Sequence, residues 1–354
     1  MKYAWLMAPL ALVQVPERTP DGFLVARPGH VFQFPKDHGS HPGFRTEWWY
    51  WTGHLTDARG QAYGFQLTFF RQASPTAAWK GSAAWRSDEI HLAHAALTDA
   101  TGGTFLTEER LDRGGLMAGA AESGIQVFHG SWSGTADHLR FQVRGRTLDL
   151  QVKALTPPVI FGEDGVSRKG ADPTAASHYV TFPRLEVSGT LGAAGSPLQR
   201  VRGLAWMDHE WSSNQLDRDQ VGWDWAGIQL NDGRSLMAYR LRKADGSSDP
   251  FSSASLVNAQ GQVTARTRTF RMTPMGAWAS PRSGARYPLP LELEAFGETW
   301  TLEPLLPDQE LGAHRPGGIT YWEGACRVKD AAGVERGRAY LELTGYAHSL
   351  KGRF

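Results

Sequence analysis

Short segments in which apolar and polar residues alternate constrain the fold of this chain more than any other feature. In "YGFQLTFF" the alternation places Tyr63, Phe65, Leu67 and Phe69 on one face of an extended segment. A strand with one side against a core shows this period of two. Segments with helical periodicity are few and short by comparison. The sequence therefore predicts an all-β protein with many antiparallel strands.

Turn-forming cassettes separate these strand-like segments. "TDARG" at 56–60, "TDATGG" at 98–103, "NAQG" at 258–261 and "KDAAG" at 329–333 each lie between two of them. "WAGIQLNDGRSLMAYRLR" indicates a hairpin that turns at 231–233, because Asn, Asp and Gly favour tight turns. Many antiparallel strands joined by such turns are typical of a sandwich or a barrel.

Chain length and one turn-rich stretch suggest the domain organisation. The 354 residues are long for one core and suit two domains. "LGAAGSPLQR" at 191–200 is rich in small and turn-forming residues, and we place the break there. We therefore expect an N-terminal β-domain over 21–195 and a C-terminal β-domain over 196–354, preceded by a leader over 1–20.

The first residues have the layout of a short secretory signal. One lysine precedes an apolar run from 3 to 13, and a polar segment with prolines follows. The run is too short to span a bilayer, and the order of its parts matches a signal that is removed after export. We therefore expect a periplasmic or secreted protein.

Composition excludes several classes of partner. Lys and Arg number 37 against 36 Asp and Glu, so a net charge of +1 supplies no field for a polyanion, and nucleic acid is not expected as a partner. The single cysteine, Cys326, excludes an intramolecular disulfide and a cysteine-rich zinc site, and we expect it to fill apolar space. The 14 tryptophans require several cores or a wide apolar cavity.

Common catalytic and nucleotide-binding motifs are absent from the sequence. It contains no G-x-S-x-G, no G-x-G-x-x-G after a strand, no P-loop and no H-E-x-x-H. Two histidine pairs have metal-like spacing: His38 with His41 in a loop, and His91 with His94 in "EIHLAHAAL". In a strand, a separation of three residues points the rings of the second pair to opposite faces. We expect no metal and no cofactor.

The segment 205–225 concentrates titratable groups and large rings. In "MDHEW" the alternation puts Asp208 and Glu210 on one face of a strand, with His209 and Trp211 on the other. A histidine beside a tryptophan in an apolar pocket is a usable general acid or base. Alternatively, these residues tie two domains together, with Glu210 in a structural ion pair.

Asp224, near the end of the same segment, likewise has either a catalytic or a structural role. In "GWDWAGIQL" Trp223 and Trp225 share one face, and Asp224 shares the other with Ile228 and Leu230. A carboxylate among aliphatic neighbours is either paired or has a shifted pKa, and a carboxyl whose pKa is raised toward neutrality can donate a proton. If Asp224 lies instead at a strand end that reaches water, it needs no such role.

Further segments interleave rings and acids. In "TEWWYWTGHL" Glu47 and Trp49 share one face and Trp48 and Tyr50 share the other, so we expect this strand to be buried on both sides. Near the C-terminus, "TYWEGACRV" and "GRAYLELTGY" repeat the mixture. These clusters either line one cavity or fill two cores, and the alternation is consistent with both.

Six segments occur in the order expected of a known family: "FPKDHGSHPGFRTEWWYWTGHL", "YVTFPRLEVSGTL", "GLAWMDHEWSSNQL", "WDWAGIQL", "TYWEGACRV" and "GRAYLELTGY". The chain resembles the bacterial lipocalin-like proteins grouped as AttH, which are related to carotenoid 1,2-hydratase. The resemblance extends over about 32–346, nearly the whole chain after the leader.

The resemblance implies two lipocalin-like antiparallel β-barrel domains around an apolar cavity. In the carotenoid hydratases, water is added across an isoprenoid C=C by an acid–base set with an H-x-W element and a Tyr and an Asp downstream. His209 and Trp211 match H-x-W, and Asp224 is the candidate for the acid. No tyrosine lies beside Asp224, where Trp223 and Trp225 stand instead, and an indole N–H can only donate.

Two functions stay open. The first is a hydratase-like enzyme acting on an alkene of an isoprenoid or lipid-like substrate; the second is a carrier or chaperone of a hydrophobic ligand at the membrane beside an ABC export system, as the AttH grouping implies. A cavity that shapes polyenes for cyclisation is a third, rarer alternative. The candidate catalytic residues are Asp208, His209, Trp211 and Asp224. The candidate substrate-binding residues are Glu47, Trp48, Trp49, Tyr50, Trp223, Trp225, Tyr321 and Trp322.

Overall fold

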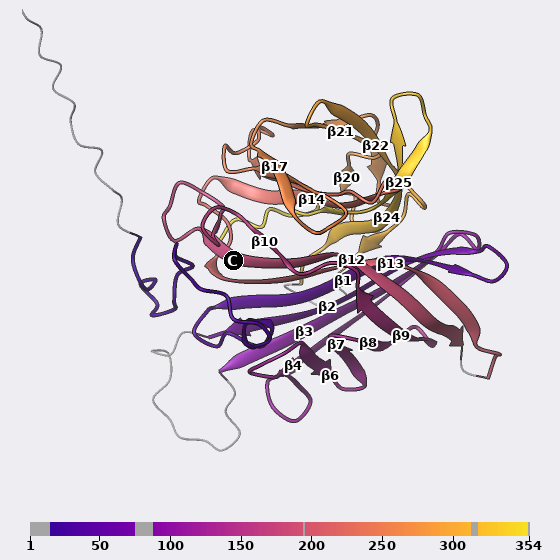
Figure 1. Ribbon diagram of the computed structural model, residues 1–354, viewed down its shortest axis with the longest axis horizontal. Helices are drawn as coiled ribbons and strands as arrows, with labels where there is room; N and C mark the ends of the chain where they lie inside the picture. The colour runs from indigo at the N-terminus through magenta and orange to yellow at the C-terminus, as the bar shows by residue number, and fades with distance from the viewer. Residues whose placement is uncertain (1–14, 75–87, 194, 313–317, 353–354) are drawn as a thin grey trace, which may run out of the picture.

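The computed structural model describes residues 15–74, 88–193, 195–312 and 318–352. The leader expected at 1–20 falls mainly outside these ranges. Regular structure in the described part is almost entirely β-strand, and the one helical element there is a three-residue turn, η1 (Lys36–His38). Within these ranges, no helix has the length and apolarity needed to cross a bilayer. The two large sheets lie one above the other (Figure 1).

The N-terminal sheet curls into a nearly closed barrel. Its strands are β1 (Thr46–Asp57), β2 (Ala62–Ala73), β3 (Glu89–Asp99), β4 (Thr104–Arg113), β5 (Ala118–Ala120), β6 (Gln126–His129), β7 (Trp132–Thr135), β8 (His138–Val143), β9 (Arg146–Ala154), β10 (Val159–Phe161), β11 (Ser167–Arg168), β12 (Ala176–Ala193) and β13 (Gln199–Asn214). They follow the order β4-β3-β2-β1-β13-β12-β9-β8-β7-β6-β5, with β10 and β11 beside β12. Strands β6 and β8 lie against β3, which brings the two ends of the sheet together. Trp49, Trp51, Phe65 and Phe141 fill the interior.

The C-terminal sheet is a curled half-barrel. Its strands are β14 (Gln220–Leu230), β15 (Ser235–Lys243), β16 (Ser253–Val257), β17 (Val263–Thr267), β18 (Arg271–Pro274), β21 (Leu291–Ala295), β22 (Glu298–Pro304), β23 (Glu310–Leu311), β24 (Tyr321–Asp330) and β25 (Glu335–Leu343). They follow the order β17-β16-β15-β14-β25-β24-β22-β21-β18, with β23 beside β24. The short strands β19 (Trp278–Ala279) and β20 (Arg286–Tyr287) pair separately. Trp300, Trp322, Leu341 and the buried Cys326 belong to the core of this sheet.

The predicted all-β fold with two barrel-like sheets is confirmed. The turn cassettes join β1 to β2, β3 to β4, β16 to β17 and β24 to β25, and residues 231–233 join β14 to β15. The expected domain break needs correction, because 191–200 connects β12 to β13 within the N-terminal sheet. The chain crosses to the second sheet after β13, at 215–219. A stretch of small, turn-forming residues suits a hairpin tip as well as a linker, so composition alone misplaces the break.

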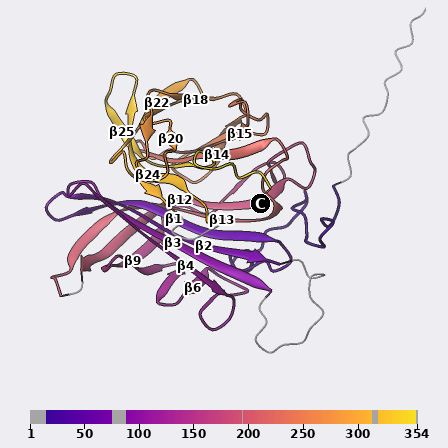
Figure 2. The same ribbon diagram turned by 180° about the vertical axis from the view of Figure 1, so that it is seen from behind.

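A third core lies between the two sheets (Figure 1, and Figure 2 from behind). Trp225 and Tyr340 from the C-terminal sheet pack in it against rings from the N-terminal sheet. Gln229 crosses the junction, where its Nε2 donates to the carbonyl oxygens of Pro183 and Ala205, each at 2.8 Å. Strand β1 lies under this junction and is buried on both faces, as its sequence predicts.

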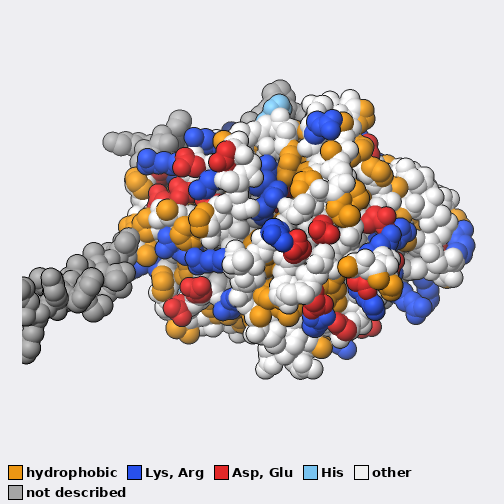
Figure 3. Space-filling model, turned by 90° about the horizontal axis from the view of Figure 1, so that it is seen from above, with side chains coloured by type: hydrophobic (Ala, Val, Ile, Leu, Met, Phe, Trp, Pro, Cys, Tyr) orange, Lys and Arg blue, Asp and Glu red, His pale blue; other side chains and the backbone are white. Residues whose placement is uncertain are grey.

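The surface mixes both signs of charge. Figure 3 shows Lys and Arg side chains interspersed with Asp and Glu over the face seen from above. This agrees with the net charge of +1.

One glycine shows how closely β1 and β13 approach. Gly203 of β13 pairs with Leu55 of β1, and an added Cβ would lie 1.8 Å from the carbonyl oxygen of His54. We expect Gly203→Ala to lower the free energy of unfolding by about 1–3 kcal/mol, the usual effect of overpacking, in a denaturant titration. Gly312→Ala is the matched control, because a Cβ there meets nothing within 4 Å. Equal stability of the two variants would contradict the close β1–β13 contact.

Candidate functional site

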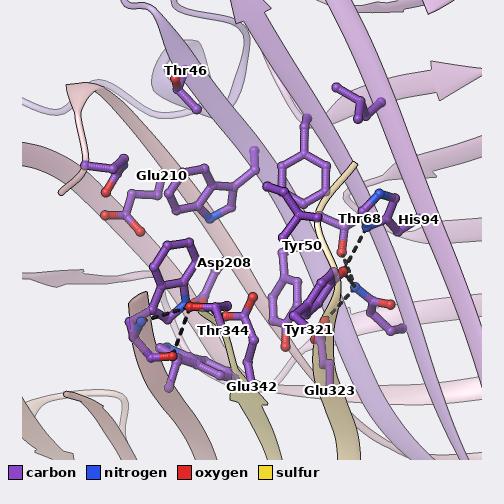
Figure 4. Close-up of a pocket in the computed structure, with 18 of the residues that line it drawn as sticks. Thr46, Tyr50, Thr68, His94, Asp208, Glu210, Tyr321, Glu323, Glu342 and Thr344 are labelled. Carbon is purple, nitrogen blue, oxygen red and sulfur yellow. Dashed lines mark hydrogen bonds between the residues drawn. The ribbon is translucent and has the colours of Figure 1, made fainter. Parts of the chain in front are cut away.

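A cavity of about 390 Å³ lies between the two sheets, outside both barrel interiors (Figure 4). Strands β1, β2, β3 and β13 supply one side of its lining, and β14, β15, β24 and β25 supply the other. Rings and aliphatic side chains such as Trp48, Phe70, Leu92 and Ile319 form much of the surface, with carboxyl groups among them. Small-molecule sites are commonly found at junctions of this kind.

Strand alternation decides which side chains reach this cavity. Asp208 and Glu210 of β13 face it, as do Trp48 and Tyr50 of β1. The antiparallel register pairs Tyr50 with Asp208 and Trp48 with Glu210, so each ring stands beside an acid. The predicted sharing of faces is confirmed for both strands.

Asp208 is a buried carboxyl held by three neutral donors. It accepts hydrogen bonds from Trp206 Nε1 and from the Tyr179 hydroxyl, each at 2.7 Å, and from the hydroxyl of Thr181. Burial raises the pKa of Asp208 to about 7, although the three donors oppose the rise. Asp208 therefore exchanges its proton close to neutral pH.

Glu210, one step along the same face, has a cationic partner. Lys169 Nζ lies 2.9 Å from Glu210 Oε1, and the hydroxyl of Ser177 donates to the same oxygen. Burial opposes the charge of Lys169, but Glu210 beside it keeps the pKa of the amine above its usual value. The structural ion pair expected for Glu210 is present, with Lys169 as its partner.

Two acids face each other across the β24–β25 ladder. Glu323 and Glu342 occupy paired positions of the register, where like charges repel. Burial and the neighbouring Glu342 hold the pKa of Glu323 well above its usual value. Burial raises the pKa of Glu342 to about 7, although Trp223 Nε1 donates to this carboxyl at 2.8 Å. Glu342 is therefore close to half-protonated at neutral pH, and the upward shift for Glu323 favours its neutral, protonated form.

A hydrogen-bond network fixes the Glu323 side of the cavity (Figure 4). Gln66 Nε2 donates to Glu323 Oε2 at 2.8 Å and to Thr68 Oγ1 at 3.0 Å. The Tyr321 hydroxyl lies 2.8 Å from His94 Nδ1. Burial lowers the pKa of His94 to about 4, so this ring is neutral at pH 7 and hydrogen-bonds without adding charge.

His209 and Trp211 point to the other face of β13, away from the cavity. His209 Nε2 lies 2.9 Å from Glu47 Oε1, and its ring stacks on Trp49 with centroids 4.7 Å apart. Trp211 stacks on His41 with centroids 3.8 Å apart. The alternation predicts that His209 and Trp211 share a face, but the cavity covers the opposite face. The expectation that they would reach the ligand pocket is therefore corrected.

His41, Glu47 and His209 form a group whose ligand atoms lie within 4.8 Å of one another, a set that could hold a metal ion. The Glu47 carboxylate is already saturated with donors, because it accepts from both rings, at 2.7 and 2.9 Å, and from Arg71 Nε at 3.0 Å. Burial opposes its charge, but the bonds from His209 and His41 lower the pKa of Glu47. We interpret the group as an ion cluster that ties β1, β2 and β13 together.

Asp224 lies inside the C-terminal sheet rather than on the cavity. It accepts hydrogen bonds from Arg240 Nε at 2.8 Å, from Arg242 Nε at 3.0 Å and from the Tyr346 hydroxyl at 3.0 Å. This is the paired arrangement, one of those that the sequence leaves open for Asp224, and its expected place as the acid of the pocket is corrected. Trp322 is likewise buried in the core of this sheet.

Half of the residues expected from the sequence meet at the cavity. Those that line it are Trp48, Tyr50, Asp208, Trp223, Trp225 and Tyr321, and those that do not are Glu47, Trp49, His209, Trp211, Asp224 and Trp322. Sequence reasoning missed Gln66, His94, Lys169, Tyr179, Glu323 and Glu342 as site residues. The turn at 329–333 was a usable signal for Glu323 and Glu342, because it fixes which residues of its two flanking strands pair. Lys169 lies in a loop without any motif.

The fold and the site together define a lipocalin-like protein with an acidic, aromatic cavity between two barrel-like sheets. A family model described as AttH-like matches residues 25–346. The chain therefore belongs to the AttH-like family.

Solved structures agree with this assignment. A protein described as an AttH from Nitrosomonas europaea is 34% identical, with 90% of this chain and 98% of that chain covered and a TM-score of 0.82. Kievitone hydratase from Nectria haematococca is 14% identical over 94% of this chain and 98% of its own, with a TM-score of 0.65. CghA, solved with Sch210972, is 14% identical over 93% and 98%, with a TM-score of 0.53. The last two show a shared fold. No curated protein matches the sequence.

The buried acids make stability depend on pH. The pKa of Asp208 is about 7 in the folded protein against 3.8 for an ordinary aspartate, so between these values the unfolded chain binds fewer protons. Stability therefore falls as pH rises through this window, by at most about 4 kcal/mol from this group. We expect thermal denaturation to give a lower Tm at about pH 8 than at about pH 5, and a smaller difference for Asp208→Asn.

The matched control for this measurement is Glu186→Gln, an exposed position on the neighbouring strand β12. It should keep the wild-type difference between the two pH values. If Asp208→Asn shows the same difference in Tm between the two pH values as the wild type, the raised pKa of Asp208 is contradicted.

Proposed function

We propose that the chain is a hydratase-like enzyme that adds water to, or removes it from, a C=C of an uncharged isoprenoid or lipid-like molecule. One observation carries the proposal: carboxyl groups that hold or exchange protons near neutral pH face each other across an aromatic cavity. Asp208 of β13 lies on one side, with Glu323 of β24 and Glu342 of β25 next to each other on the other. Paired acids with separated pKa values are what general acid–base chemistry requires.

The protonation states assign a role to each group. In the elimination direction, protonated Glu323 gives its proton to a leaving hydroxyl, so the C–O bond breaks and water departs. The carboxylate of Asp208 or Glu342 takes a proton from the adjacent carbon, and that electron pair forms the C=C. Hydration is the reverse, with the proton passing to carbon from Asp208 or Glu342 and the proton of water passing to Glu323. Faces of Trp48 and Trp225 in the lining would stabilise positive charge on carbon.

The comparisons support this proposal at the level of the fold. Kievitone hydratase, which its name identifies as a hydratase, and CghA, solved with a small molecule, share the fold at 14% identity each. Membership of the AttH-like family sets the same architecture. The reaction itself is argued from the side chains of this cavity.

A carrier of a hydrophobic ligand is the second candidate function. The observation that favours it is the edge of the cavity, where Trp48, Trp223 and Ile319 are apolar and only partly buried. Such an edge lets an apolar molecule enter and leave without chemistry. Export and an association with a membrane transporter, expected from the sequence, belong to this second proposal.

Turnover separates the two functions. We expect the purified protein to convert the isoprenoid alcohol linalool to its alkene, or to place labelled oxygen from water into the alcohol formed from the alkene myrcene, as followed by mass spectrometry. Glu323→Gln should lose about 100-fold or more of this rate, because it removes the acid, while exposed Glu186→Gln keeps it. Binding without any conversion in the wild type would favour the carrier. Full turnover in Glu323→Gln would remove the assigned acid.

The pH dependence of elimination should follow the base. Asp208 and Glu342 both have a pKa of about 7, and only their ionised forms accept a proton from carbon. We therefore expect kcat/KM for elimination to rise with pH and to level off above neutrality. In Asp208→Asn and Glu342→Gln, the variant that removes the true base should lose both the rise and most of the rate. A rate that falls across this range would contradict the assignment.

A further inference from the structure

One end of the cavity holds polar atoms that the described chain leaves without a hydrogen-bond partner. They include the hydroxyl of Tyr50, Oε1 of Gln66 and Oε1 of Glu323. Gln66 and Glu323 are each 1% exposed and Tyr50 is 7% exposed, and all three line the cavity. Buried polar groups are normally paired, because leaving one unpaired sacrifices its interaction with water. Three of them at one end of a cavity therefore indicate a place for a polar ligand group.

The surrounding contacts hold these side chains in place without giving the three atoms a well-formed hydrogen bond. Gln66 Nε2 is committed to Glu323 Oε2 and Thr68 Oγ1, which fixes the amide and leaves its Oε1 directed elsewhere. The Tyr50 hydroxyl interacts with Glu323, and burial raises the pKa of this tyrosine. With the proton that the raised pKa of Glu323 favours on its free oxygen, this end offers two O–H donors and one carbonyl acceptor. A group that both accepts and donates hydrogen bonds matches that set.

Charge selects against an ionised ligand group. Asp208, Glu323 and Glu342 line the cavity. Its two lining cations are already paired, Lys169 with Glu210 and Arg71 with Glu47. A carboxylate or phosphate would be repelled by these acids as they ionise. An ammonium group could donate but could not accept from two O–H donors. An alcohol or phenol hydroxyl fits both the charge and the donor set.

We infer that the Tyr50–Gln66–Glu323 end of the cavity is a hydroxyl-binding subsite for an uncharged, largely hydrocarbon ligand. The ligand hydroxyl is placed among these three side chains, of which Figure 4 labels Tyr50 and Glu323, and the hydrocarbon part against Trp48, Phe70 and the rest of the apolar lining. Under the proposed function, on which this last step rests, this hydroxyl is the one that the reaction adds or removes. The selectivity for an alcohol follows from the binding groups alone.

The test compares probes that differ only in their polar group: geraniol, geranylamine, geranate and the matching hydrocarbon, in which a methyl replaces the hydroxymethyl group. Quenching of tryptophan fluorescence reports each Kd. We expect geraniol to bind at least about fivefold more tightly than the hydrocarbon, and more tightly than either ionised probe. Equal affinity for geraniol and the hydrocarbon, or tighter binding of geranylamine, would overturn the inference.

Tyr50→Phe tests the subsite without removing its fold. Among the described residues the Tyr50 hydroxyl interacts with Glu323 but makes no well-formed hydrogen bond, so the variant should stay close to the wild-type Tm while losing most of the preference for geraniol. Tyr63→Phe is the control, because its hydroxyl bonds Gln61 and Gln199 away from the cavity, and it should keep the preference. If Tyr50→Phe retains the preference for geraniol over the hydrocarbon, the inference is wrong.

The subsite and the proposed reaction can fail separately. Alcohol selectivity that depends on Tyr50, in a protein that never converts linalool, leaves the subsite standing and ends the hydratase proposal. Turnover of linalool in a protein without selectivity for the alcohol probe supports the hydratase proposal and overturns the subsite.

Discussion

The pairing of β1 with β13 is the constraint on which the rest of the structure depends. Its register sets Trp49 beside His209 on the face toward the N-terminal barrel, and Tyr50 beside Asp208 on the face toward the cavity. A slip of one residue would exchange the two faces, moving a saturated ion cluster into the cavity and the cavity acids into a core. Gly203 permits the close approach of these strands near their other end. The two most recognisable segments of the sequence, "TEWWY" and "DHEW", are the two sides of this ladder.

The protein buries its acids in two different ways. Glu47 and Asp224 each contact guanidinium groups: Arg71 for the first, and Arg240 with Arg242 for the second. Asp208 has only neutral donors, and Glu323 and Glu342 oppose each other, so burial raises their pKa values. The first arrangement holds charge for structure, and the second keeps protons available at neutral pH. Apart from Glu210, a cavity-facing acid that is paired with Lys169, the division follows the two faces of the strands.

The sequence predicts which side chains share a face of a strand, but not whether a cavity or a core lies against that face. Alternation correctly grouped Trp48 with Tyr50 and Asp208 with Glu210, yet it cannot say which face meets a cavity and which a core. His209 therefore appeared as a candidate for the pocket, although its ring stacks on Trp49. The pairing of Asp224 with Arg240 was available from the hairpin at 231–233, whose register sets them opposite each other. Lys169 could not be found, because it comes from a loop whose path depends on the whole fold.

The order of strands has a consequence for synthesis of the protein. β14 hydrogen-bonds to β25, the last strand of the described chain, and Glu342 lies on β25. The N-terminal sheet can assemble on a ribosome long before that strand emerges, leaving the aromatic outer face of β1 and β13 bare on the nascent chain. A polypeptide that ends before β25 would expose this apolar face to chaperones and proteases. The cavity, to which β25 contributes Glu342, is therefore completed only after this late strand has been synthesised.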